Sequence, residues 1–321
     1  MSTVVGIDVG GTKVAATLLG PDGLGETKLQ PTTLDSGDAL IDQLVEVVGE
    51  AAGGQSFDAV GIGVPSIVRF ETGEIAASTN IPLKGVPLRK VLGERLGVPV
   101  FVDNDATVAA LAEAHDENLE LVSPNLVIIT VGTGIGGGIV IDGRIFRGGS
   151  GGAGELGMTL IGLASEPDMQ PSGQHFPQPG SLEALASGTA LDRFARAAAE
   201  HRDSSLATLA AAAKPVLGPD AVAAAKAGDE YAMAAVRRWA HAVGVGIANA
   251  INTFDPDEVV IGGGAATVGD LLLEPATQFA AGYVHPGLQG RAAVRIARWG
   301  VTAGVLGAAL LAAHELERDP T

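Results

Sequence analysis

Two segments of the chain, about 120 residues apart, repeat one pattern: an apolar strand, a glycine turn and a second apolar strand. The first segment runs from Val4 to Gly23 around the turn Gly10-Gly11-Thr12. The second runs from Leu126 to Gly143 around the turn Gly132-Thr133-Gly134. A glycine turn between two strands predicts a β-hairpin. We therefore expect two lobes of similar build, each opening with such a hairpin.

Short apolar runs alternate with helical patterns along the chain. The apolar runs predict strands at residues 4–9, 14–19, 59–64, 98–102, 126–131, 138–141, 258–261 and 293–297. The patterns between them predict helices at residues 39–52, 87–96, 105–117, 182–186, 190–200, 229–252, 268–283 and 302–315. Such alternation indicates an α/β protein with parallel strand pairing.

Charge and composition exclude several classes of partner. With 20 basic and 37 acidic residues, the chain carries a formal net charge of −17, which repels nucleic acid and anionic membranes. The absence of cysteine excludes disulfides, thiolate nucleophiles and cysteine-ligated zinc. We see no signal peptide at the N-terminus, and the apolar run at residues 301–313 is too short to span a membrane. We therefore expect a cytoplasmic protein without a nucleic-acid or membrane partner.

Three glycine turns are candidates for holding a nucleotide, because glycine exposes backbone N–H groups and lets phosphate oxygens approach closely. The first two turns, described above, would bind phosphate. The third turn contains Gly263 and Gly264 and follows an apolar strand, and its open backbone suits an adenine or a ribose. Their candidate residues are Asp8, Gly10, Gly11, Thr12, Lys13, Gly132, Thr133, Gly134, Gly263 and Gly264. The Asp8 carboxylate could also hold Mg²⁺, directly or through water. A plain hairpin with a solvated Asp8 and a simple strand-to-helix turn at Gly263 are the competing interpretations.

Polar residues between the turns are candidates for binding and activating a hydroxyl compound. Asn104 and Asp105 stand where a strand ends and a helix begins, a position that favours the carboxylate anion. Together they could bind a vicinal diol and remove a hydroxyl proton, unless Asp103 or Asp105 is only a helix cap. Glu155 and Glu183 could accept hydrogen bonds from sugar hydroxyls, although Glu183 could equally be a surface residue at a helix start.

In this order, the motifs resemble those of the ROK family (repressor, open reading frame, kinase), within the actin/Hsp70/hexokinase-like ATPases. The resemblance covers nearly the whole chain and includes residues 63–65, 80–82, 86–88, 104–106, 132–138 and 154–157. It implies a two-lobed α/β fold with ribonuclease H-like lobes. We assign residues 1–113 and 302–321 to a small lobe and residues 114–301 to a large lobe. We also expect a homodimer or homotetramer.

The resemblance further implies an ATP- and Mg²⁺-dependent hexose kinase, a glucokinase that makes glucose 6-phosphate. Asp105 would be the general base that accepts the proton of the sugar 6-hydroxyl, and we expect its pKa to be lowered. The residues implied to bind the sugar are Asn80, Asn104, Asp105, Glu155 and Glu183. Those implied to lie near the nucleotide include Asp8, Gly10, Thr12, Thr133 and Gly264.

The chain departs from the family pattern on the sugar side and in a zinc loop. Met158 replaces a histidine that touches the sugar in the family, and Ser66 replaces a glycine. Residues 165–181 lack the family's cysteine ligands, so we expect a proline-rich loop without zinc, with His175 solvated. Met158 offers no comparable hydrogen bond. Fructose, mannose, an amino or N-acetyl hexose, or a cyclitol therefore stay open as acceptors.

Three alternatives to a sugar kinase that uses ATP are a polyphosphate-dependent glucokinase, a sugar-responsive repressor and a sugar sensor without activity. A polyphosphate-dependent glucokinase would want a basic groove, which the charge of −17 disfavours. A sugar-responsive repressor would carry a DNA-binding domain before the first glycine turn, where the sequence leaves no room. A sugar sensor without activity would not need both phosphate turns and Asp105.

Overall fold

The computed structural model describes residues 2–78, 80–162 and 176–318, which form two compact units. The first unit draws on Met1–Pro124, Gly138–Gly154 and Trp299–Thr321, and the second on Asn125–Gly137 and Glu155–Arg298. The lobes expected from the sequence place Gly138–Gly154 with the large lobe, and their boundaries stay a prediction. His175 and most of the loop expected at residues 165–180 lie outside the described residues.

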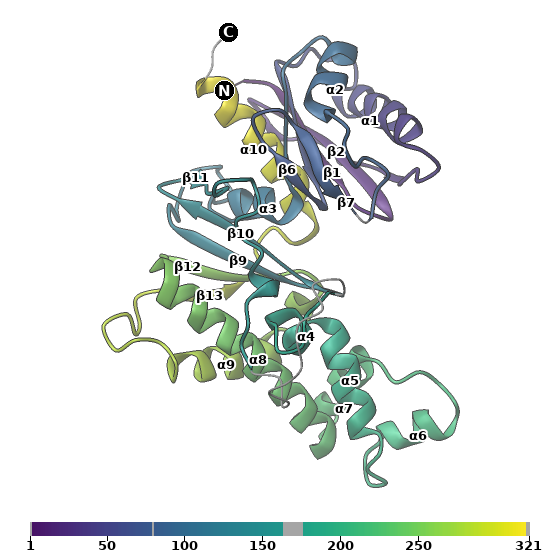
Figure 1. Cartoon of the computed structure of the whole chain (residues 1–321), viewed down its shortest axis with the longest axis vertical. Helices are drawn as coiled ribbons and strands as arrows, with labels where there is room; N and C mark the ends of the chain where they lie inside the picture. The colour runs from purple at the N-terminus through teal and green to yellow at the C-terminus, as the bar shows by residue number, and fades with distance from the viewer. Residues whose placement is uncertain (1, 79, 163–175, 319–321) are drawn as a thin grey trace. The chain divides into compact units, whose positions relative to one another are not determined.

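A six-stranded sheet forms the centre of the first unit (Figure 1). Strand β1 (Val4–Val9) pairs antiparallel with β2 (Lys13–Gly20) and parallel with β5 (Ala59–Val64), which pairs parallel with β8 (Val100–Asn104). The short strands β3 (Gly23–Leu24) and β4 (Lys28–Pro31) both pair with β2. A separate antiparallel ribbon consists of β6 (Ser66–Arg69) and β7 (Glu74–Ser78).

Helices cover both faces of this sheet. Alternate residues of a strand point to opposite faces, so each strand contributes side chains to the packing on both. Val5 and Ile7 join the core on the face covered by α1 (Gly37–Ala52) and α2 (Leu88–Leu96). On the other face, α3 (Asp105–Glu113) packs beside α10 (Ala303–Arg318), the last helix. The backbone of α10 lies so close to β1 and β5 that a Cβ at Gly6 or Gly61 would overlap it.

The second sheet has the strand order β11-β10-β9-β12-β13. Its hairpin consists of β9 (Leu126–Val131) and β10 (Ile135–Ile141), which is followed by β11 (Arg144–Ile145). Strand β12 (Glu258–Gly262) pairs parallel with β9 and with β13 (Ala293–Ile296). Both sheets thus contain a hairpin and two further strands that run parallel to its first strand, which confirms the repeated hairpin.

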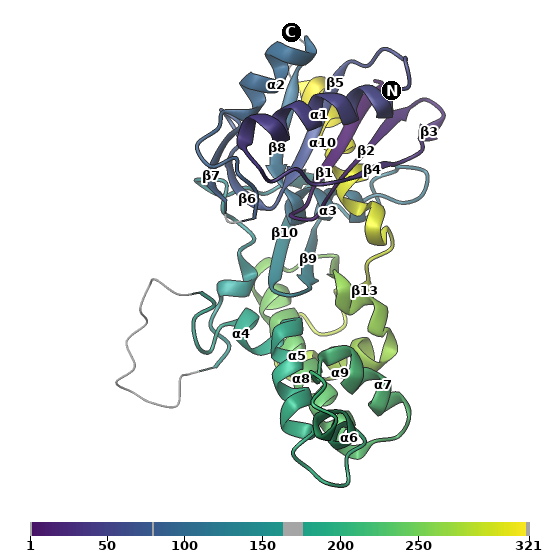
Figure 2. The ribbon, with the colours of Figure 1, turned by 90° about the vertical axis from the view of Figure 1, so that its right-hand side faces the viewer.

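Helices make up most of the second unit. In Figure 2, four of them gather around α8 (Glu230–Phe254), and it packs against each: α4 (Leu182–Ala186), α5 (Gly188–Ala198), α7 (Gly218–Lys226) and α9 (Asp270–Ala281). Trp239 anchors this core, because its buried indole N–H donates to the carbonyl oxygen of Ala186 at 2.7 Å. The remaining helical elements are α6 (Leu206–Ala211) and the 3-10 turns η1 (Leu156–Met158), η2 (Gly264–Val268) and η3 (Gly300–Thr302).

Every strand and helix predicted from the sequence is present: β1, β5, β9 and α4 have the predicted ends, and the others are shifted at one end or both. Helix α3 ends at Glu113 and not at Glu117, because the Asp116 carboxylate accepts the N–H groups of Asn118 and Glu120 and forms a turn instead. The sequence reading missed the short strands β3, β4, β6, β7 and β11 and the helices α6 and α7. Among the described helices, none has the length and hydropathy of a membrane span.

Candidate active site

Asn104 and Asp105 lie side by side at the junction of β8 and α3. The Asn104 side chain caps the helix, since its Oδ1 accepts the N–H of Thr107 at 3.1 Å. Asp105 is the first helical residue, and its Oδ1 accepts the N–H of Ala106 at 2.8 Å. The interpretation of an aspartate as the cap is therefore wrong: the amide caps the helix.

The carboxyl group of Asp105 has a higher pKa than an ordinary aspartate. Burial raises its pKa to about 6, and the nearby charge of Asp8 adds to the rise, while the hydrogen bond from Ala106 opposes it. The expected lowering of this pKa is therefore wrong, because desolvation outweighs the helix N-terminus. A pKa of about 6 suits a general base, since the group is ionised at neutral pH yet binds a proton readily.

The Asp8 carboxylate on β1 fits a divalent cation. Burial raises its pKa, Lys13 opposes the rise, and no hydrogen-bond partner for it occurs within the described residues. Mg²⁺ in nucleotide sites is held by one or two carboxylates, with water and phosphate completing its shell. No cluster of three or more His, Cys, Asp or Glu residues that could hold a metal occurs in the described parts of the chain. Asp8, with Asp105 near it, could therefore hold Mg²⁺ only together with water or phosphate.

The first glycine turn is a tight, exposed hairpin end. The Gly10 N–H donates to the Lys13 carbonyl oxygen at 2.8 Å, which leaves Gly11 and Thr12 at the tip. A Cβ at Gly11 would lie 3.6 Å from the Cβ of Asn80, so Asn80, a predicted sugar ligand, lies beside this turn. Because this hairpin end is exposed, its tip is accessible to a ligand.

The second glycine turn is held by α4 and α5. Gly188 N–H donates to the Gly132 carbonyl oxygen at 2.7 Å, and the Thr189 hydroxyl donates to the Thr133 carbonyl oxygen at 2.8 Å. Oε2 of Glu183 accepts the N–H of Ile135 at 2.7 Å. Glu183, predicted to bind sugar, thus supports the second glycine turn, while its Oε1 has no hydrogen bond among the described residues.

Glu155 lies close enough to Glu183 for the charge of one carboxylate to act on the other. Partial burial and the charge of Glu183 both raise the pKa of the Glu155 carboxyl. Glu155 is exposed at the start of η1, and the half-buried Met158 ends that turn. Within the first unit, the Asn104 amide nitrogen donates to the Ser66 carbonyl oxygen at 3.4 Å, whereas the buried Ser66 hydroxyl has no hydrogen-bond partner among the described residues.

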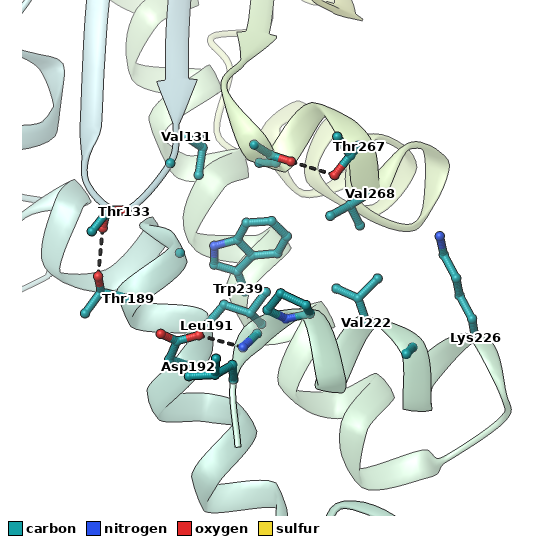
Figure 3. A pocket seen from close by; sticks show the side chains of 18 residues that line it. Val131, Thr133, Thr189, Leu191, Asp192, Val222, Lys226, Trp239, Thr267 and Val268 are labelled. Carbon is teal, nitrogen blue, oxygen red and sulfur yellow. Dashed lines mark hydrogen bonds between the residues drawn. The ribbon is translucent and has the colours of Figure 1, made fainter. Parts of the chain in front are cut away.

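A pocket of about 720 Å³ opens beside the second glycine turn (Figure 3). Gly132, Thr133 and Gly264 line it, so the structure brings together residues that the sequence assigns to the nucleotide. Gly134 and Gly263 adjoin these residues in the chain. The sequence reading missed the remaining walls, which come from α5, α7, α8 and η2 and include Thr189, Leu191, Asp192, Pro219, Val222, Lys226, Trp239 and Val268. The Gly218-Pro219 pair at the start of α7 was the available signal, because proline is favoured in the first turn of a helix.

Known proteins resemble this chain over most of its length. The glucokinase of Halalkalibacterium halodurans is 36% identical over 94% of this chain and 92% of its own. The N-acetyl-D-glucosamine kinase of Shigella flexneri is 35% identical over 81% of this chain and 83% of its own. A ROK family glucokinase from Streptomyces griseus, solved in complex with glucose and AMPPNP, superposes with a TM-score of 0.77 at 30% identity and covers 97% of this chain and 99% of its own.

These similarities bear out the expected fold, which is the actin/hexokinase-like ATPase fold of sugar kinases. The match to the family itself extends further along the chain than any single motif. The ROK family model covers residues 4–315, and the chain therefore belongs to the ROK family.

Proposed function

We propose that this protein transfers the γ-phosphoryl group of ATP to the 6-hydroxyl of a hexose, with glucose as the acceptor. The observation that carries the proposal is the Asp105 carboxylate, half-buried at the start of α3 beside Asn104 and with a pKa of about 6. The H. halodurans relative is a glucokinase, and the S. griseus structure contains glucose and AMPPNP.

Asp105 would act on the attacking hydroxyl. As the sugar O6 forms a bond to the γ-phosphorus, the bond from that phosphorus to the β–γ bridging oxygen breaks and ADP leaves. The O6 proton passes to the Asp105 carboxylate, and Asn104, fixed by its cap to α3, orients the sugar. Mg²⁺, held on the Asp8 side, would neutralise charge on the phosphoryl oxygens.

The nucleotide would occupy the pocket of the second unit. The apolar side chains of Leu191, Val222 and Val268 suit the faces of an adenine, and Lys226 adds a positive charge among the lining residues. Gly132 and Thr133 of the second glycine turn line the same pocket, so the backbone of this turn would receive the phosphates. ATP is therefore the donor that this geometry supports, whereas polyphosphate has no use for an apolar base pocket.

The sugar would be bound by Asn80, Asn104 and Glu155 and by Oε1 of Glu183. Met158 supplies no hydrogen bond at its position, which leaves room for an acceptor other than glucose. N-acetylglucosamine is the second candidate, because a 35% identical relative is a kinase for that sugar.

A panel of sugars tests the proposal. Purified protein with ATP and Mg²⁺ should release ADP when glucose is added. Asp105→Asn should slow that release by about 10²–10⁴-fold, while calorimetry should still detect glucose binding. ADP release with N-acetylglucosamine but not glucose would change the acceptor and keep the kinase. No sugar-stimulated release with any acceptor would contradict the proposal. Polyphosphate in place of ATP serves as the donor control.

We further propose a homodimer or homotetramer that works in the cytoplasm and holds no zinc. The absence of cysteine supports the last point, since it removes the usual zinc ligand. Sedimentation velocity and metal analysis of the purified protein test the assembly and the zinc content.

A further inference from the structure

Arg147, which follows β11, makes three contacts in three directions although its side chain is only 17% exposed. Its Nε donates to Oδ2 of Asp103 at 2.7 Å, and its Nη2 donates to Oε1 of Glu315 on α10 at 3.2 Å. The guanidinium carbon Cζ lies over the ring of Phe70, 3.5 Å from the ring centroid. One planar side chain thus connects β8, α10 and the residue that follows β6.

Asp103 carries this connection to the proposed catalytic residues. Its side chain is 3% exposed, and its Oδ1 accepts the backbone N–H of Asn104 at 2.9 Å. The two oxygens of one carboxylate therefore join Arg147 to the peptide group between Asp103 and Asn104, one residue before Asp105. Any movement of the guanidinium would shift the backbone from which both Asn104 and Asp105 project.

Arg147 also anchors a loop that could not hold its shape alone. Residues 148–152 comprise four glycines and one serine, a composition with a high conformational entropy when free. The Arg147 carbonyl oxygen accepts the N–H of Ala153 at 3.1 Å and closes the loop. Gly151, with φ of 83°, lies so close to the Val68 carbonyl oxygen that a Cβ would overlap it. The chain leaves this loop at Gly154, next to Glu155.

Stability alone does not account for this arrangement. Replacing a buried ion pair by apolar residues of similar size is often neutral or stabilising, because desolvation offsets the attraction. A lysine would also compensate the charge of Asp103, but it lacks the planar fork that reaches two carboxylates and an aromatic face together. The contacts with Asp103, Glu315 and Phe70 thus hold the guanidinium in one position.

We propose that Arg147 is a positioning residue for phosphoryl transfer: through Asp103 it fixes the Asn104–Asp105 backbone, and through its own backbone it fixes the loop before Glu155. The proposal rests on the proposed function. Since a displacement of about 1 Å in a reacting group can cost a hundredfold in rate, loss of the support should lower kcat. The nucleotide pocket includes neither Arg147 nor its partners, so the KM for ATP should not change.

The test compares Arg147→Lys, the neutral double variant Asp103→Asn with Arg147→Met, and Arg69→Met. Arg69 is the matched control, an exposed arginine that pairs with Glu74 at 3.1 Å on the neighbouring ribbon. We expect the lysine and double variants to have kcat at least about tenfold below wild type, a raised KM for the sugar and an unchanged KM for ATP. The control should match the wild type in all three.

The double variant separates positioning from stability. It leaves no unpaired charge, because Glu315 still pairs with Arg318 at 3.3 Å, and it should melt near the wild-type temperature. A kcat within twofold of wild type in either the lysine or the double variant would overturn the proposal. A rise in the KM for ATP equal to that for the sugar would overturn it too, since that is the result of general loosening. If the wild-type protein shows no sugar-stimulated ADP release, the proposed function fails first, and the two failures are thus distinguishable.

Discussion

Oε2 of Glu183 accepts the backbone N–H of Ile135 at 2.7 Å, so that the first turn of α4 supports the end of the second glycine turn. The approach is close enough that a Cβ on Gly134 would lie 2.5 Å from the same oxygen. A carboxylate that sequence reasoning assigns to the sugar therefore also shapes the backbone beside the nucleotide pocket. Glu155, its neighbour, has no such hydrogen bond among the described residues.

Glu183→Ala should weaken the binding of both ATP and the sugar, whereas Glu155→Ala should weaken the binding of the sugar only. A hydrogen bond to a charged group contributes about 1.5–3 kcal/mol, so loss of the support should raise the KM for ATP by about tenfold or more. Steady-state kinetics with each substrate varied in turn measure this difference. An unchanged KM for ATP in Glu183→Ala would show that the turn does not need the carboxylate.

The catalytic rate should depend on the ionisation of Asp105. The general base must be deprotonated in the free enzyme, and its pKa is about 6, so kcat/KM should rise with pH and level off above that value. Asp105→Asn should lower kcat by about 10²–10⁴-fold, the usual contribution of a general base. A pH profile of kcat/KM from pH 5 to 8 checks the first expectation, and a flat profile across pH 6 would contradict it.

The same substitution should stabilise the fold at neutral pH. The pKa of Asp105 is higher in the folded state than the ordinary 3.8, so folding favours the protonated form and stability falls as the pH rises from about 4 to about 6. A shift of about two units corresponds to about 3 kcal/mol at most. Thermal melts of Asp105→Asn at pH 7 should show a higher Tm than wild type, and a difference that shrinks toward pH 4. A lower Tm at pH 7 would argue against a destabilising carboxylate.

Two adjacent glycines should respond differently to substitution. Gly264 lines the nucleotide pocket and a Cβ there meets no atom, so Gly264→Val should fold normally and occlude nucleotide. Gly263 has φ of 74°, and a Cβ there would lie 2.6 Å from the Val131 carbonyl oxygen, so Gly263→Ala should unfold at a lower temperature. Titration with a fluorescent ATP analogue and thermal melts distinguish the two. Tight nucleotide binding by Gly264→Val would place the adenine elsewhere.

Close helix packing predicts opposite effects for two helical glycines. A Cβ at Gly307 in α10 would overlap the Val108 carbonyl oxygen in α3, so Gly307→Ala should destabilise the first unit by about 2 kcal/mol or more. Gly49 in α1 is exposed and a Cβ there meets no atom, so Gly49→Ala should raise the free energy of unfolding by about 0.5–1 kcal/mol. Denaturant unfolding measures both changes in one assay. Equal effects would mean that α10 shifts to accept the methyl group.

The parts of the fold that the sequence predicted are those with strong local signals. Apolar strands such as Val4–Val9 and long helices such as Glu230–Phe254 follow from periodicity alone. Helix α7 was missed because its first turn contains Gly218 and Pro219 and the rest is mostly alanine, without large apolar residues at helical spacing. The ribbon of β6 and β7 was missed because its strands have only four and five residues.

Site residues divide in the same way. Asn104 and Asp105 could be found because a strand end and a helix start are local features. The pocket around Trp239 could not, because it is made by α5, α7 and α8, which are separated in the sequence and meet only through packing. The pKa of Asp105 was predicted in the wrong direction, since burial depends on tertiary structure and outweighs the local helix N-terminus. The support of Ile135 by Glu183 likewise joins residues far apart in the chain.

The packing of α10 on β1 and β5 bears on how the chain folds during synthesis. The ribosome adds about 5–20 residues per second, so the sheet of the first unit is complete many seconds before Ala303–Arg318 emerges. Through that interval α10 is missing from the sheet face that contains Gly6 and Gly61, and α3 alone can cover part of that face. Nascent chains that stall before residue 303 should therefore be susceptible to proteolysis in their N-terminal part, and release of the final helix should protect a segment made at the very start of translation.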